Sequence, residues 1–257
     1  MSHAIKIRIL LALTAIILTG VLFIDPVAQD TDYHQFADAT TAFGVPNIWN
    51  VLSNIPFVLI GILGLIKTRK CFMEKPDEAW NMACQVFFVG LILTGFGSAF
   101  YHLSPTNETL LWDRLPMTIS FMAFFSLIVS LHINLRLGAV ALWPLLIIGM
   151  ASVFYWSYTE GAGVGDLRFY AVVQFLPMIL LPIILIMFPV SNYQKKYVWV
   201  LITLYFIAKL MENFDVDIYH ILGISGHTIK HIIAAFSGLA FLLTVLSISS
   251  RDKHVIK

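Results

Sequence analysis

Residues 80–102 read WNMACQVFFVGLILTGFGSAFYH and contain no Asp, Glu, Lys or Arg. A helix needs about 20 mostly apolar residues to cross the hydrocarbon core of a bilayer, where its backbone polar groups must be hydrogen-bonded internally. This stretch is long and apolar enough, so it predicts a membrane-spanning helix. Two polar residues near its end, Ser98 and His102, lie four positions apart and therefore share a helix face.

Similar apolar stretches recur along the whole chain. Of its 257 residues, 59% are hydrophobic and 12% charged, whereas a soluble domain is about half apolar and about a quarter charged. The connectors are short and polar, which leaves no room for a second domain. We therefore expect an all-α integral membrane helical bundle. Its spans are roughly 8–24, 48–66, 80–102, 110–133, 137–156, 169–188, 197–213 and 227–248.

The first span has two interpretations. Lys6 and Arg8 before an apolar run also describe a signal peptide. The stretch Ile24-Asp25-Pro26-Val27-Ala28 lacks a small-x-small cleavage site, which favours a retained helix. The expected organisation is an N-terminal transmembrane helix or signal anchor over residues 1–30, a seven-helix domain over 31–250 and a cytoplasmic tail over 251–257.

Charge predicts orientation and excludes one class of partner. With the N-terminus inside, 12 of the 16 Lys and Arg residues lie on the cytoplasmic side, the other four being Arg114, Arg168, Lys209 and Lys230. We therefore expect both termini in the cytoplasm, and the short loops favour a bacterial inner membrane. The net charge of +1 without a long basic tract argues against nucleic acid. No feature identifies a protein partner.

Ionisable residues inside a bilayer are costly, so each is a functional hypothesis by default. His227 and His231 share a face at the start of the last span, at the same membrane end as His102. Three imidazoles can bind zinc with water in the fourth position, and Asp113 at similar depth could accept the proton of that water. The structural alternative is a histidine that is only hydrogen-bonded. It is preferred for the isolated histidines His34, His132 and His220.

Several motifs occur in a specific order. They are Trp49-Asn50, Ser53-Asn54, Gly97-Ser98-x-x-x-His102, Asp113, Pro116-Met117 and His227-x-x-x-His231. Together they resemble the motifs of the alkaline ceramidase family. That family belongs to a superfamily of seven-helix transmembrane hydrolases that includes adiponectin-receptor relatives and lipid-remodelling proteins of glycolipid anchors. The similarity runs from about Asp32 to Phe241, most of the chain.

The resemblance implies a zinc-dependent amidase that hydrolyses the sphingolipid ceramide, or a related N-acyl lipid, to a fatty acid and a free amine. It implies His102, His227 and His231 as zinc ligands. Asp113 would be the general base, and Ser98 a helper near the water or the oxyanion. An acyl chain could lie in a tunnel among the helices while its amide reaches the hydrated end. Candidate lining residues are some of Phe87, Phe88, Phe96, Phe100, Phe121 and Phe125.

Two features depart from the family pattern. Members that bind calcium use an acidic stretch resembling Asp-Trp-x-Glu-x-Asn and a Glu before Trp-Asn. Here the stretch reads Asp32-Tyr33-His34-Gln35-Phe36-Ala37-Asp38, and Asn47 takes the place of the Glu. Calcium prefers several carboxylate and carbonyl oxygens, so the sequence argues against a calcium site and leaves only weak ligands. These are Asp32, Asp38 and Asn47. The N-terminal span also exceeds the seven-helix pattern.

Other functions stay open at this stage. A receptor-like protein or an ester-cleaving lipid-remodelling enzyme could share the metal site. A metal transporter is a different class, and the apolar cytoplasmic halves of the helices argue against it because they offer an ion no onward path. Lys209 and Glu212 are predicted to form an i, i+3 ion pair. Its expected role is structural, with support of the zinc site or contact with a lipid head group as the alternative.

Overall fold

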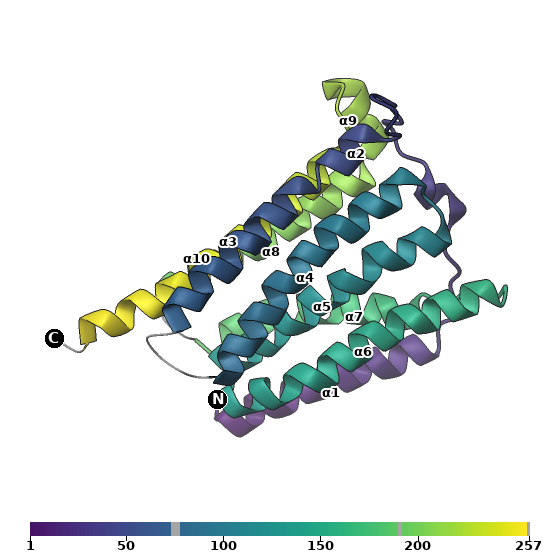
Figure 1. The fold of residues 1–257 in the computed structure, drawn as a ribbon. Coiled ribbons are helices and arrows are strands. Elements are labelled where there is room, and N and C mark those ends of the chain that lie inside the picture. Colours follow the sequence, from purple (N-terminus) through teal and green to yellow (C-terminus); the bar gives the residue numbers. More distant parts are fainter. Residues whose placement is uncertain (73–77, 190–191, 256–257) are drawn as a thin grey trace.

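A computed structural model describes residues 1–72, 78–189 and 192–255, and in these residues it has helices but no strand, which confirms the all-α prediction. The elements are α1 (His3–Leu22), the short 3-10 helix η1 (Thr31–His34), α2 (Ile48–Leu52), α3 (Ile55–Phe72), α4 (Glu78–Leu103), α5 (Asn107–His132), α6 (Leu135–Gly161), α7 (Arg168–Met187), α8 (Asn192–Asn213), α9 (Asp215–Leu222) and α10 (Gly226–Val255). Figure 1 shows the long helices running side by side as a bundle.

Seven segments of the described chain are long and apolar enough to cross a membrane, so the protein is a multi-pass membrane protein. The helices α2 and α3 count as one such span. The remaining expected span, 197–213, passes the same test only together with α9, which is bent by 83° from α8. The helix α10 continues to Val255 and so takes in most of the predicted tail, whose last two residues lie outside the described ranges.

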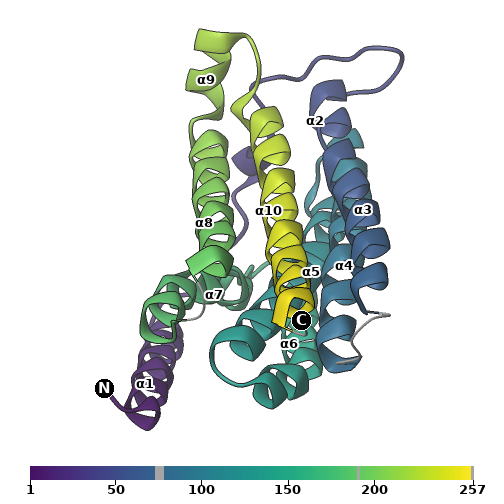
Figure 2. The same ribbon diagram turned by 90° about the vertical axis from the view of Figure 1, so that its left-hand side faces the viewer.

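The candidate site lies at one end of the bundle and both termini lie at the other. Figure 1 places α2 and α9 at the end where α4 finishes and α10 begins. In Figure 2, α10 lies between α8 and α3, and it packs against both helices. The three sequence motifs that carry Ser98, Asp113 and His227 therefore come together at the end of the bundle away from the termini.

The helix α1 is peripheral. It packs on α7, and Leu10 is its buried residue. The segment from 23 to 47, which we call the connector, leads from α1 to the opposite end of the bundle and carries η1. The connector is held on the way by the backbone hydrogen bond from Leu167 N to Val27 O, 2.9 Å long.

Gly97 brings α4 and α5 together beside the candidate site. A Cβ at this position would lie 2.0 Å from the backbone oxygen of Trp112 and 3.2 Å from Pro116. Only glycine allows this approach, because a contact of 2.0 Å with a backbone atom cannot be relieved by a rotamer change. Ser98 follows Gly97 and Asp113 follows Trp112 in the sequence. The close approach of the two helices therefore sets how near the side chains of Ser98 and Asp113 lie.

Candidate metal centre

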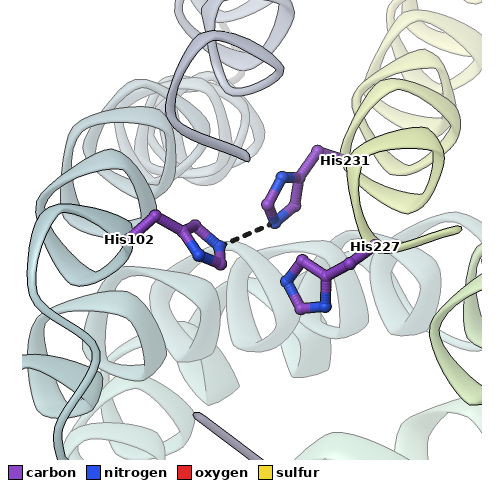
Figure 3. Close-up of side chains that lie close together, drawn as sticks. All are labelled: His102, His227 and His231. Carbon is purple, nitrogen blue, oxygen red and sulfur yellow. Dashed lines mark hydrogen bonds between the residues drawn. The ribbon is translucent and has the colours of Figure 1, made fainter. Parts of the chain in front are cut away.

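His102, His227 and His231 converge from two helices to form the histidine cluster (Figure 3). His102 lies in the last turn of α4, and the other two lie in the first turns of α10. One ring nitrogen from each histidine lies within 4.8 Å of the other two. The three residues are only 1%, 4% and 3% exposed. The convergence predicted from helix periodicity is therefore present, and the cluster could bind a metal ion.

The tautomer of His231 is set by Ser53. The hydroxyl of Ser53 donates to the carbonyl oxygen of Asn50 over 3.0 Å, so its single proton is used there. Ser53 Oγ must therefore accept the 2.8 Å hydrogen bond from Nδ1 of His231. This leaves Nε2 of His231 with its lone pair facing the cluster, which is how a hydrogen bond on the far nitrogen prepares a histidine for a metal.

His102 also has the chemistry of a ligand. Its Nε2 lies 3.3 Å from Nε2 of His231, and its Nδ1 is buried without a hydrogen-bond partner among the described residues. Its backbone oxygen accepts a 3.0 Å hydrogen bond from Asn47 Nδ2, which anchors the end of α4. Three buried neutral imidazoles with converging nitrogens suit Zn²⁺, which accepts nitrogen ligands in tetrahedral sites.

Three charged side chains, Lys209, Glu212 and Lys230, adjoin the cluster, and we call them the charged group. Lys209 Nζ lies 2.5 Å from Glu212 Oε2, so the predicted ion pair is present. Lys230 Nζ lies 2.7 Å from the other carboxylate oxygen of Glu212 and 3.3 Å from Nε2 of His227. Lys230 therefore links the carboxylate to the histidine cluster, a role that the sequence did not reveal.

Asp113 and Ser98 lie where the sequence motifs placed them. Both are buried, and both line the same cavity as His231. The structure thus brings a carboxylate, a hydroxyl and a histidine of the cluster to one cavity wall. Their roles in a reaction stay predictions.

The cavity extends from the cluster into the apolar interior of the bundle. Its volume is about 320 Å³, within the range of sites that hold a small molecule. Phe87 and Phe121 line it, which confirms part of the predicted tunnel. Two other predicted lining residues are wrong, because Phe96 and Phe100 are 61% and 49% exposed on the outer surface. The remaining two, Phe88 and Phe125, belong to the hydrophobic core and do not line the cavity.

The connector covers the cluster with three side chains, Tyr33, His34 and Phe36, which we call the roof. The Phe36 ring centre lies 4.6 Å from those of both His102 and His227. His34 is hydrogen-bonded to the hydroxyl of Tyr101 and to Asn107, each over 2.9 Å. The sequence of this segment indicated only weak calcium ligands and an isolated histidine, and no pattern in it predicted the roof.

Tyr33 joins the roof to the charged group. Its hydroxyl donates to Glu212 Oε1 over 3.2 Å. Burial raises the pKa of the Tyr33 hydroxyl well above its usual range, so the hydroxyl stays protonated as a donor. The roof is therefore hydrogen-bonded to the bundle at both Tyr33 and His34.

The weak calcium candidates are not joined to one another. The Asp32 carboxylate accepts from Gln35, and the Asp38 carboxylate accepts from the backbone of Thr40. Asn47 donates to His102, as described above. In residues 1–72, 78–189 and 192–255 no hydrogen bond links any two of the three candidates. Calcium binding at these residues is not tested by these contacts, and the expectation against a calcium site stays a prediction.

Fold and site together define a helical membrane protein with a candidate metal centre beside an apolar cavity. The chain belongs to the ceramidase family, because the family model described as Ceramidase matches residues 38–254. No individual curated protein matches the chain significantly. The match begins within the connector and includes both helices of the histidine cluster. The predicted boundaries at residues 30 and 250 are close to these limits but stay predictions.

Proposed function

We propose that this protein is a membrane-embedded, zinc-dependent amidase that hydrolyses the N-acyl amide of ceramide or a related lipid to a fatty acid and a free amine. The observation that carries the proposal is a cluster of three buried histidines, one of which, His231, lines an apolar cavity together with the buried carboxylate of Asp113. Membership of the ceramidase family supports the substrate class.

In this proposal His102, His227 and His231 hold the zinc ion, and Ser53 keeps His231 in the required tautomer. Bound zinc would supply a Lewis acid that lowers the pKa of water to about 7 and polarises a carbonyl oxygen. The neutral imidazole is the form of histidine that binds metal.

Asp113 is the proposed general base. Its carboxylate takes a proton from the attacking water as the water oxygen bonds to the amide carbon, and it returns that proton to the amine nitrogen as the C–N bond breaks. Ser98, which lines the cavity together with Asp113, is the proposed helper near the water or the oxyanion. A positioned base of this kind contributes about 100- to 10,000-fold to a rate.

The acyl chain is proposed to lie in the cavity, where apolar side chains such as Phe87, Leu91 and Phe121 replace the lipid environment. The head group and the amide would then lie at the polar end, near His231 and Asp113. This arrangement lets a substrate remain partly within the hydrophobic layer while its amide is hydrolysed.

The decisive experiment is metal analysis of the detergent-purified protein together with fatty-acid release from a panel of N-acyl lipids. We expect about one zinc per chain and fatty-acid release that stops on chelation. His227→Ala should lose most of the metal, whereas the control His220→Ala, at an exposed position on α9, should keep it. Asp113→Asn should keep zinc but lose about 100-fold or more of the activity. A wild-type protein that cleaves no lipid of the panel would refute the amidase proposal.

We also propose that the site faces away from the cytoplasm of a bacterial inner membrane, because most Lys and Arg residues lie at the other end. Glu108 is exposed in the first turn of α5, which begins four residues after α4 ends, and Arg136 is exposed in the first turn of α6, which follows the far end of α5. In a background without cysteine, Glu108→Cys should react with an impermeant reagent on intact cells and Arg136→Cys should not. The reverse pattern would invert the orientation.

A further inference from the structure

Arg114 is a buried cation beside the proposed reaction centre. It follows Asp113 on α5, is 6% exposed, and lines the same cavity as Ser98 and His231. Neither the sequence motifs nor the proposed reaction gives it a role. A guanidinium group is always charged in a protein, and its burial is costly unless its donors are satisfied.

Neutral groups hold this guanidinium in place. Nη2 of Arg114 donates to Gln29 Oε1 over 2.5 Å. The guanidinium carbon lies 4.2 Å from the ring centre of Trp156, 4.8 Å from that of Tyr170 and 5.7 Å from that of Tyr33. Aromatic faces attract a cation and fix its plane, but they do not accept its remaining N–H groups.

One end of the guanidinium is unsatisfied. Nη1 of Arg114 is buried and has no hydrogen-bond partner among the described residues, and no carboxylate of those residues lies within 4.0 Å of its side chain. Buried donors without a partner are rare in folded proteins. The planar fork of arginine matches the two oxygens of a carboxylate or the oxygens of a phosphate.

The cavity as a whole has an excess of positive charge. The charged side chains that line it are Asp113, Arg114, Lys209, Glu212 and Lys230. Glu212 already accepts hydrogen bonds from both lysines. Three cations therefore face two anions, and neither carboxylate lies within 4.0 Å of the Arg114 side chain. A divalent metal on the histidine cluster would increase the excess.

We infer that Arg114 is a specificity-determining residue that binds an acidic oxygen of the lipid head group close to the amide, so that N-acyl lipids with a carboxylate there are preferred over neutral ones. The inference rests on the proposed function for the position of the amide. The rings of Tyr33, Trp156 and Tyr170, which we call the aromatic cage, orient the guanidinium together with Gln29. Nη1 supplies the free donor. The same chemistry would bind the carboxylate of a released fatty acid, so the test includes that ligand.

The test measures ligand binding to the purified full-length protein, which requires no turnover. The ligands share one acyl chain: N-dodecanoylglycine, which has a carboxylate beside the amide; N-dodecanoylethanolamine, which has a hydroxyl there; and dodecanoic acid. We expect the wild type to bind the glycine conjugate about 10-fold or more tightly than the ethanolamine conjugate, the scale of a charge-assisted hydrogen bond. Arg114→Gln should abolish that preference, while Arg136→Gln, a charge loss at the other end of the bundle, should keep it.

Metal content and thermal unfolding show whether each variant is folded. If Arg114→Gln does not fold, Arg114→Lys keeps the charge without the fork and should reduce the preference several-fold. Equal binding of the two conjugates by wild type would overturn the inference. An unchanged preference for the glycine conjugate in a folded Arg114 variant would also overturn it. The same holds if the variant weakens the binding of dodecanoic acid alone. Equal hydrolysis of both conjugates would refute the inference and leave the amidase proposal standing. A preference in binding without hydrolysis of either conjugate would refute the amidase proposal and leave the inference standing.

Discussion

The histidine cluster and the roof are in contact through Phe36, but different forces hold them. The cluster is carried by two long helices, α4 and α10, and its geometry follows from helix periodicity. The close approach of α4 and α5 at Gly97 positions the neighbouring residues Ser98 and Asp113. The roof belongs to an irregular connector and is held by a few side-chain contacts, such as the 3.2 Å hydrogen bond from Tyr33 to Glu212. Changes on the cluster side should therefore be far more damaging than changes in the roof.

The largest effect is expected at Gly97. In Gly97→Ala the new Cβ would meet the Trp112 oxygen at 2.0 Å, so α4 and α5 must move apart. Such overpacking costs about 1–3 kcal/mol, and it separates Ser98 from Asp113. We expect a lower unfolding temperature and a loss of about 100-fold or more in lipid-amide hydrolysis.

Gly161→Ala is the matched control, because its Cβ would meet nothing within 4 Å. Both variants replace a helical glycine with alanine, so they differ in the close contact and not in helix propensity. If the two variants proved equally stable and active, the close approach at Gly97 would not be what sets the site.

An intermediate effect is expected at Ser53. Ser53→Ala removes the acceptor of the 2.8 Å hydrogen bond from His231, together with the 3.0 Å hydrogen bond that the Ser53 hydroxyl donates to the Asn50 carbonyl. Loss of such a supporting partner lowers metal affinity by about 10- to 100-fold. Competition with a chelator of known affinity measures this change. Ser104→Ala, at an exposed position beyond α4, is the control and should bind metal like wild type.

The smallest effect is expected in the roof. Phe36→Ala removes an aromatic ring from His102 and His227, and aromatic pairs contribute about 0.5–1.5 kcal/mol. We expect full zinc content and a less than about 10-fold change in the KM for a lipid amide. Phe43→Ala, 98% exposed in the same connector, should change neither quantity. Zinc loss in Phe36→Ala would show that the roof is part of the metal site and not only its cover.

The same difference explains what the sequence could predict. Helix spans and the pairing of His227 with His231 follow from local periodicity, and the ordered motifs connect them to His102. The roof could not be predicted, because its contacts join the connector to residues such as Glu212 that are far away in sequence. The aromatic cage of Arg114 is also long-range, since its members come from the connector, α6 and α7.

The wrong expectations for Phe96 and Phe100 had a local cause. In a helix of 3.6 residues per turn, a residue two positions before His102 points about 200° away from it. Phe100 therefore points to the outer surface when His102 points inward, and its 49% exposure agrees. Residue type alone does not tell which face of a helix a phenylalanine occupies, so the predicted lining set included residues from the outer face.

The contact at Gly97 is made by backbone atoms, and this has a dynamic consequence. Side chains exchange rotamers on picosecond to nanosecond timescales, whereas a backbone oxygen has no rotamer of its own. The separation of α4 and α5 beside Ser98 and Asp113 is thus independent of side-chain exchange. Alignment of these two residues should persist as fluctuations of the surrounding lipid change the packing of outer side chains, because it depends on two helix axes and not on the lipid-facing surface.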